Sequence, residues 1–236
     1  WKKNRINILK KSVDKLFVIL PFELTYFSTR NIHTLYFGHP LLDIVQLDSS
    51  KETVLGKPII ALMPGSRKQE VQNILPTMLL ATKNFPDYRF VIICSQSVKR
   101  SIYEDLVKDY HIELKFDKHI LPCCVAALVA SGTATMELAI LKIPQVVCYR
   151  LNIITYLIAK LLTHLRYISL VNILAKKKVV SELIQHDFNV KNINHELSLV
   201  LKKENRQIML DEYSKICNNL GSQGSFQKIA KVVYSD

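Results

Sequence analysis

Short runs of apolar residues alternate with longer amphipathic stretches through most of the chain. Four runs are almost continuously apolar and read as buried strands, at 58–63, 89–94, 125–130 and 145–149. Other stretches repeat their apolar positions at helical spacing, which predicts helices at 67–84, 98–110, 133–142 and 153–164. Strands that are apolar on both faces are typical of a parallel sheet covered by helices on both sides. The pattern therefore predicts an α/β fold.

The two ends of the chain complete this prediction. Near the start we expect helices at 4–12 and 22–29 and strands at 15–20 and 33–37, and further along a strand at 112–116. The polar stretch 43–57 lacks clear periodicity and reads as a linker, whereas the tail 179–236 reads as wholly helical. Residues 1–42 should therefore finish one domain, and residues 58–236 should form a second with a helical C-terminus.

Two turns that follow predicted strands carry the candidate chemistry, because ligands of open α/β sheets bind beyond the carboxyl ends of the strands. The first turn is LMPGSRKQE, where Ser66 and Gln69 have capping-box spacing and predict a helix from Arg67. Gly65 permits a tight turn and the close approach of a ligand. The start of a helix attracts anions, and Arg67 adds a guanidinium suited to phosphate. An ordinary capped helix with a surface arginine fits the same residues.

The second turn, LVASGTATMELA, places an acid one turn into a helix. Ser131 or Thr133 is expected to cap this helix, and Gly132 leaves room for a ligand. Glu137 lies four residues after Thr133 and six after Ser131, so neither pair has the three-residue spacing of a capping box. Its carboxylate could interact with the helix dipole, which this turn alone favours. It could instead accept hydrogen bonds from the two hydroxyls of a nucleotide ribose.

The two turns together are more informative than either alone. One supplies a cation and a helix start, and the other supplies hydroxyls and an acid, a combination that suits a nucleoside diphosphate. Neither the dinucleotide fingerprint G-x-G-x-x-G nor the Walker pattern occurs in the sequence. Nucleotide-sugar transfer is the class of chemistry that remains.

Charge and cysteine content narrow the possible partners. The net charge is +12, with basic residues gathered near the start and at Lys176–Lys178. Such charge attracts nucleic acid, anionic membrane or phosphorylated substrates alike, and solvated lysines explain it equally well. Because no nucleic-acid motif accompanies it, we do not expect a nucleic-acid partner. The five cysteines form no C-x-x-C pair and the seven histidines lack metal-ligand spacing, so we expect buried thiols and no metal site.

The most apolar part of the chain, 151–174, is expected not to span a membrane. Lys160, His164 and Arg166 interrupt it, so no uncharged stretch reaches the roughly 18–20 residues that a spanning helix needs. An amphipathic helix, packed on the core or lying at a membrane surface, is the expected structure.

Six segments, in order and over nearly the whole chain, resemble the lipid-A-disaccharide synthase family of GT-B glycosyltransferases. They are PFE (21–23), FGHPLLD (37–43), LMPGSRKQEV (62–71), ASGTATMELA (130–139), IPQVVCYR (143–150) and YISLVNILAKKKVVSELIQHDF (167–188). The resemblance implies two Rossmann-like domains facing each other across a cleft. This chain would then be the C-terminal portion, comprising the end of the acceptor-side domain (1–42), a linker (43–57) and the donor-binding domain (58–236).

The resemblance also implies an activity. Members of the family join UDP-2,3-diacylglucosamine to 2,3-diacylglucosamine 1-phosphate (lipid X), giving lipid A disaccharide 1-phosphate and UDP without a metal. It implies a cytoplasmic protein, peripheral on the anionic inner face of the cytoplasmic membrane of a Gram-negative bacterium, and a homodimer. Arg67 would contact the diphosphate, Glu137 the ribose and Asn172 the nucleotide. The expected UDP-sugar site is Gly65, Ser66, Arg67, Ser131, Gly132, Thr133, Glu137 and Asn172.

The chain departs from the family's pattern in several places. Val171 stands where proline is usual, Lys176–Lys178 occupies a stretch that usually contains glycine, and Val125 replaces a common acid. The family's glycine-rich turn, lipid-binding surface and presumed catalytic acid have no counterpart in the sequence and are expected upstream of Trp1. The alternative is therefore a truncated relative that binds UDP or a partner subunit without catalysing transfer.

Overall fold

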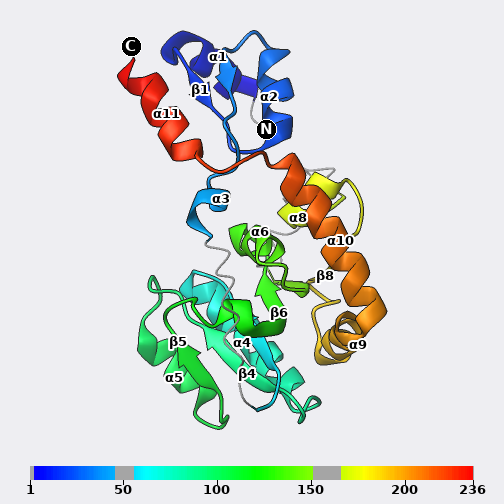
Figure 1. Ribbon diagram of the computed structural model, residues 1–236. Helices are drawn as coiled ribbons and strands as arrows, with labels where there is room; N and C mark the ends of the chain where they lie inside the picture. The colour runs from blue at the N-terminus through cyan, green and yellow to red at the C-terminus, as the bar shows by residue number, and fades with distance from the viewer. Residues whose placement is uncertain (1–2, 46–55, 151–165, 236) are drawn as a thin grey trace. The chain divides into compact units, whose positions relative to one another are not determined.

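The computed structural model describes residues 3–45, 56–150 and 166–235 (Figure 1). Their contacts divide the chain into two compact units. Unit 1 combines residues 1–46 with residues 215–236, and unit 2 comprises residues 47–214. The predicted helix 153–164 and most of the predicted linker lie outside the described residues.

Unit 2 is built on a six-stranded sheet in which every neighbouring pair of strands is parallel. The strand order is β5-β4-β3-β6-β7-β8. The bounds are β3 Ile59–Met63, β4 Arg89–Ile93, β5 Glu113–Lys115, β6 Cys124–Ala130, β7 Gln145–Tyr149 and β8 Ser181–Ile184. Strands β3 and β6 occupy the centre, where Ile60, Ala61 and Leu128 are completely buried. The predicted parallel-sheet α/β fold is confirmed.

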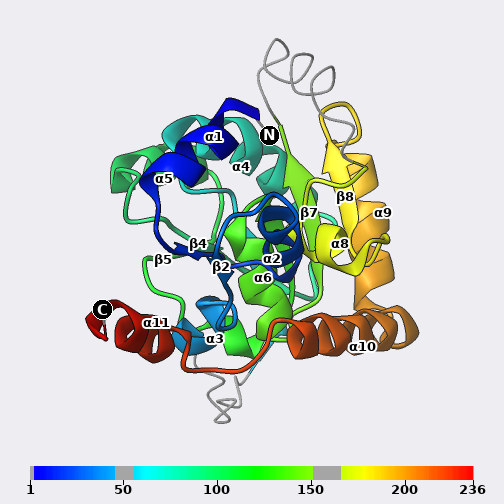
Figure 2. The same ribbon diagram turned by 90° about the horizontal axis from the view of Figure 1, so that it is seen from above.

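Helices pack against this sheet. Their bounds are α4 Lys68–Thr82, α5 Arg100–Val107, α6 Thr133–Ile140, α8 Leu170–Ala175 and α9 Val190–Leu201, with a 3-10 turn η1 at Leu121–Cys123. Helix α10, Lys203–Asn219, begins in unit 2 and ends in unit 1. In α4, Val71, Ile74, Leu75 and Met78 recur at helical spacing and are buried. Helix α4 packs with α5 and α9, whereas α6 packs with α8. Figure 2 shows β7 and β8 side by side, with α9 beside β8.

The chain reverses its direction across the sheet between β3 and β6. From β3 it moves outward through α4 to β4 and β5, and from β6 it moves the opposite way through α6 to β7 and β8. Because such crossovers are right-handed, α4 and α6 lie on opposite faces of the sheet. Open α/β sheets bind ligands at the carboxyl ends of strands where the order reverses. The ends of β3 and β6 therefore mark the expected site.

The tail of the chain corrects the sequence prediction. Residues 179–236 were predicted to be wholly helical, which is wrong, because β8 is an edge strand paired with β7. Its sequence SELI begins with two polar residues, and only Leu183 is buried. The strand therefore lacks the continuous apolar run by which the central strands were identified. The short helix α8 lies at the end of the apolar stretch 151–174, which was expected to be an amphipathic helix.

Unit 1 contains a two-stranded parallel sheet with helices around it. The bounds are α1 Lys3–Ser12, β1 Leu16–Phe17, α2 Pro21–Ser28, β2 Thr34–Leu35, α3 Leu41–Ile44 and α11 Ser225–Tyr234. Val18, Phe27 and Ile32 form its small core. The strands predicted at 15–20 and 33–37 are present but span only two residues each.

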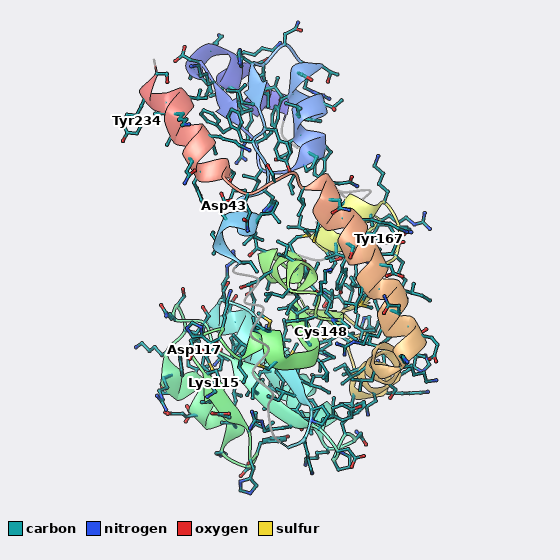
Figure 3. The ribbon with its side chains drawn as sticks, viewed as in Figure 1. Asp43, Lys115, Asp117, Cys148, Tyr167 and Tyr234 are labelled. Atoms are coloured by element: carbon teal, nitrogen blue, oxygen red, sulfur yellow. The ribbon has the colours of Figure 1, made fainter. Side chains whose placement is uncertain are left out.

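The C-terminal segment joins unit 1 through Asp43, on α3 (Figure 3). The Asp43 carboxylate accepts hydrogen bonds from the backbone N–H of Gly224 at 2.6 Å and of Phe226 at 3.1 Å. It also accepts one from the Ser225 hydroxyl at 2.6 Å. Asp43 therefore caps the start of α11. The prediction placed residues 215–236 with the second domain, whereas these contacts bring them into unit 1.

Replacing Asp43 with alanine should release α11 and lower the free energy of unfolding by about 1–2 kcal/mol, the usual cost of losing a helix cap.

The Ser225 hydroxyl, with the backbone N–H groups around it, lowers the pKa of Asp43. A lowered carboxyl pKa stabilises the fold above the ordinary carboxyl pKa, and the contribution disappears as the pH falls through the lowered value. Denaturant unfolding at neutral and acidic pH measures it. Asp14→Ala, at an exposed acid of unit 1, is the control. Equal losses for both variants at neutral pH would contradict this capping role.

Candidate functional site

A pocket of about 610 Å³ lies at the carboxyl ends of the central strands of unit 2. Segments that follow four strands line it, including Asp117 in the segment after β5 (Figure 3). The predicted residues of both turns are part of this lining: Gly65, Ser66, Arg67, Ser131, Gly132, Thr133 and Glu137. The two turns identified in the sequence therefore meet at one site.

The turn after β3 is closed by an acid that the sequence prediction did not use. Glu70 Oε2 accepts hydrogen bonds from the N–H groups of Ser66 at 3.0 Å and Arg67 at 3.2 Å. Helix α4 begins at Lys68 with Arg67 as its cap residue, so the predicted Ser66–Gln69 capping box is wrong by one position. These two N–H groups are already bonded to Glu70.

Gly65 is needed by the turn itself. Its φ of +116° lies in the region that favours glycine, and a Cβ there would come within 2.5 Å of Glu70 Oε2. The tight turn predicted at Gly65 is confirmed. The room that the glycine leaves, however, is filled by Glu70 rather than kept for a ligand.

Arg67 presents its guanidinium at the mouth of this turn. Its Nη1 lies 2.9 Å from Glu70 Oε1, and the arginine side chain is 81% exposed. Exposed ion pairs of this kind contribute little to stability. A phosphate can therefore replace Glu70 as the partner of the Arg67 guanidinium at a small cost in free energy.

The turn after β6 is open on the pocket side. Gly132 is the cap residue of α6, and a Cβ placed on it would meet no atom within 4 Å. Neither Ser131 nor Thr133 caps the helix with its side chain, contrary to the prediction, because the Ser131 hydroxyl donates to the Ile168 carbonyl oxygen at 3.3 Å. The first N–H groups of a helix have no partner within it. The start of α6 is therefore the better anion site of the two helices.

Glu137 is paired, a contact that the sequence did not reveal. Lys118 donates to Oε1 at 2.8 Å and to Oε2 at 2.6 Å. The Glu137 side chain is only 13% exposed, whereas that of Lys118 is 56% exposed. Lys118 lies in the segment after β5 and also lines the pocket. The site thus contains a carboxylate, an arginine, a lysine and a helix start.

Asn172, which was predicted to contact the nucleotide, lies outside the pocket lining among the described residues. The side chain is completely buried. Its amide nitrogen donates to the Val180 carbonyl oxygen at 2.9 Å and to Glu182 Oε1 at 2.8 Å. Its amide oxygen accepts from the N–H of Val179 at 2.7 Å and of Val180 at 2.9 Å. Asn172 therefore holds α8 to the segment that leads into β8.

The pocket shows no sign of thiol or metal chemistry in the described part of the chain. Burial raises the pKa of the Cys94 thiol to about 12, so this pocket residue stays protonated and is a poor nucleophile. Cys94, Cys124 and Cys148 are buried free thiols, as predicted. Among the described residues, no group of three or more His, Cys, Asp or Glu side chains could hold a metal ion.

A second hollow, of about 460 Å³, opens at the opposite ends of the strands. It lies at the amino ends of β3 and β4, where Lys57, Arg89, Tyr110 and His111 contribute to its lining. Ligands of open α/β sheets bind at the carboxyl ends of strands. The pocket between the two turns is therefore the stronger candidate.

Comparison with protein families decides what kind of chain carries this pocket. Residues 1–233 match the family model described as lipid-A-disaccharide synthetase. The chain belongs to the lipid-A-disaccharide synthetase family. The match covers both units, and the resemblance drawn from the sequence motifs is confirmed.

Curated relatives agree with this assignment. The lipid-A-disaccharide synthase of Acinetobacter baylyi is 32% identical, and the match covers 90% of this chain and 60% of that protein. The lipid-A-disaccharide synthase of Hahella chejuensis is also 32% identical, with coverage of 99% and 64% respectively. The chain therefore spans about 60% of the length of the A. baylyi synthase.

A solved structure gives the fold class. The S. aureus MnaA–UDP co-structure superposes with a TM-score of 0.63 at 14% sequence identity, covering 92% of this chain and 59% of that one. The synthetase-family chain therefore has the parallel-sheet α/β fold that GT-B glycosyltransferases share with UDP-sugar epimerases, as the sequence predicted.

Two residues of the pocket were not predicted from the sequence, for different reasons. Glu70 lies one residue beyond the predicted capping partner Gln69, so only the backbone geometry reveals its role. Lys118 could have been found, because it directly follows the predicted strand 112–116 and so lies at the same sheet edge as the two turns.

Proposed function

We propose that this chain binds the UDP part of a nucleotide sugar in the pocket of unit 2 and provides donor binding for a glycosyl transfer in lipid A biosynthesis. The donor is UDP-2,3-diacylglucosamine, the acceptor is lipid X, and the products are lipid A disaccharide 1-phosphate and UDP. One observation carries the proposal: the cationic turn after β3 and the acidic turn after β6 line one pocket at the reversal of strand order. Membership of the family supports it.

The diphosphate belongs at the start of α6. Glu70 already accepts the N–H groups at the start of α4, which makes that helix end unfavourable for an anion. The start of α6 has an open side at Gly132, and Arg67 lines the same pocket. An arginine and a helix start together bind phosphate through charge-assisted hydrogen bonds.

The ribose belongs at Glu137. This carboxylate lies one turn into α6, four residues after Thr133, and lines the pocket. A carboxylate accepts one hydrogen bond at each oxygen from two neighbouring hydroxyls. A nucleotide with its phosphates at the start of α6 can thus reach Glu137 with its sugar.

The roles proposed for the two parts of the chain are those that the resemblance to the family implies. Residues 58–214 carry the donor site, whereas residues 1–42 belong to the acceptor side. No residue of this chain is assigned as the catalytic base, because the family's presumed catalytic acid has no counterpart in the sequence. The resemblance further implies a homodimer. Light scattering of the purified chain tests that: a mass of two chains supports it, and a mass of one chain at micromolar concentration contradicts it.

Transfer itself is tested by adding the part of a relative that this chain does not match. The chain is fused to, or mixed with, the N-terminal part of the A. baylyi synthase, and release of UDP from UDP-2,3-diacylglucosamine is followed with lipid X as acceptor. The proposal predicts disaccharide formation above that of either part alone. Binding of UDP without transfer would support instead a relative that only binds the nucleotide. Absence of UDP binding would contradict the donor site altogether.

Acylated substrates require work at a membrane, so we place the protein peripherally on the inner face of the cytoplasmic membrane of a Gram-negative bacterium. Helix α1 exposes Arg5, Lys10 and Lys11, and its Ile8 is 61% exposed. Basic residues near an anionic surface contribute roughly 1 kcal/mol each. Within the described residues, no helix combines the length and apolar character that crossing a membrane requires.

This placement predicts salt-sensitive binding to anionic vesicles. At low salt the chain should float with phosphatidylglycerol-containing vesicles, and it should detach at high salt because the attraction is screened. Replacing Lys10 and Lys11 together with glutamate should abolish flotation at low salt. If the parent chain ignores anionic vesicles at low salt, the basic surface of α1 serves another purpose.

A further inference from the structure

Lys118 connects two elements of the pocket that are distant in sequence. Its ammonium nitrogen lies 2.8 Å from Oε1 and 2.6 Å from Oε2 of Glu137. Lys118 belongs to the segment after β5, whereas Glu137 is on α6. One ammonium group therefore bridges both oxygens of the acid that lines the pocket.

The two partners differ in their freedom to move. Glu137 is 13% exposed, and Lys118 is 56% exposed. A carboxylate withdrawn from water needs a partner, because an unpaired charge in that environment is costly. A lysine ammonium on a long, largely exposed stem can move without disturbing the core. In this pair the acid is fixed and the lysine is the movable member.

A bound ribose needs the same two oxygens. Its neighbouring hydroxyls donate one hydrogen bond to each oxygen of a carboxylate. Lys118 already bridges these oxygens and so occupies the edge that the two hydroxyls would use. Binding of the ribose therefore displaces Lys118 from at least one of them.

The displaced ammonium remains in a pocket that suits an anion. Lys118 lines the pocket together with Arg67, Gly132 and Thr133, the last two at the start of α6. A phosphate in that position gives the ammonium a charged partner in place of the one it has lost.

We propose that Lys118 is an exchange residue, which neutralises Glu137 in the free protein and transfers to the diphosphate when the ribose takes Glu137. The inference rests on the proposed function, since it requires a nucleoside diphosphate in this pocket. Its consequence is that the sugar and phosphate parts of the ligand depend on each other. A nucleoside breaks the Lys118–Glu137 pair and leaves the ammonium without an anionic partner. A nucleoside diphosphate breaks the same pair but supplies a phosphate as the new partner. Lys118 therefore selects for the diphosphate.

The test compares UDP with uridine on the full chain. Lys118→Met keeps the length of the side chain and removes its charge. UDP should bind this variant about tenfold more weakly, the loss of one charge-assisted contact. Uridine should bind at least as tightly as it does to the parent, because its competitor for Glu137 is gone. NMR titration measures both affinities, including the weak binding of uridine. Lys118→Arg keeps the charge and should retain most of the preference for UDP.

The matched control is Lys115→Met. Lys115 lies three residues earlier, pairs with Glu113 at 2.6 Å and is not part of the pocket lining, so its loss should leave both affinities unchanged. Equal weakening of UDP and uridine by Lys118→Met would show that Lys118 only supports the shape of the site. No change for either ligand would also overturn the exchange. If the parent chain itself fails to bind UDP, the proposed function fails, an outcome that no Lys118 variant can produce. Lys118→Gln serves the same comparison if Lys118→Met does not fold.

Discussion

Replacing Asn172 with alanine is expected to lower the free energy of unfolding by about 3–5 kcal/mol, since each buried polar group left without a partner costs about 1–3 kcal/mol. The substitution leaves the N–H groups of Val179 and Val180 without their acceptor. It also removes a donor from the Val180 carbonyl and from Glu182. The segment between α8 and β8 should loosen as a result.

Unfolding and binding measurements separate this structural role from the predicted nucleotide contact. Denaturant unfolding should show the large loss for Asn172→Ala, and the folded variant should bind UDP nearly as well as the parent. Asn84→Ala, at an exposed asparagine of unit 2, should change neither quantity and serves as the control. If Asn172→Ala keeps its stability and loses UDP affinity, the side chain contacts the ligand, and the buried hydrogen bonds are not its main role.

Replacing Arg67 with alanine is expected to weaken UDP binding by roughly ten- to a hundredfold, because a charge-assisted hydrogen bond to phosphate contributes about 1.5–3 kcal/mol. The stability of the fold should scarcely change. Arg67 is 81% exposed and its ion pair with Glu70 is a surface contact. Glu70 keeps its bonds to the backbone of the turn, so the shape of the pocket should survive.

Calorimetric titration of UDP into the parent and the Arg67→Ala variant measures this effect. Lys68→Ala is a close control, since Lys68 is the exposed neighbouring residue and does not line the pocket. It should retain nearly the parent affinity, which excludes a general effect of positive charge. Equal affinities for the parent and Arg67→Ala would remove Arg67 from the phosphate site.

The strands that are buried on both faces could be predicted from the sequence, because such burial requires a continuous run of apolar residues. The central strands β3 and β6 are covered on both faces, and their continuous apolar runs identified them. The edge strand β8 escaped, because Ser181 and Glu182 make hydrogen bonds to other elements and break the apolar run. The position of residues 215–236 also escaped, since it depends on contacts such as Asp43 with Ser225, which are far apart in the sequence.

The site could be predicted as far as backbone topology determines it. The turns at Arg67 and Glu137 follow central strands, and parallel strands bring their carboxyl ends to one edge. The roles of individual side chains could not be predicted in the same way. The pairing of Glu137 with Lys118 joins a loop to a helix, and Asn172 lies within the short helix α8 rather than in a loop. Such contacts depend on how segments distant in the sequence pack together, which a local sequence pattern does not show.

The central claim, that UDP binds between the two turns, is tested most directly by an NMR titration of the isotopically labelled chain with UDP. We predict that the amide resonances of Gly132, Thr133 and Ala134 at the start of α6 shift most, together with those of Arg67 and Lys118. Resonances around Lys57 and Arg89, at the hollow at the opposite ends of the strands, should stay in place. Shifts concentrated at that hollow, or no shifts at millimolar UDP, would contradict the claim.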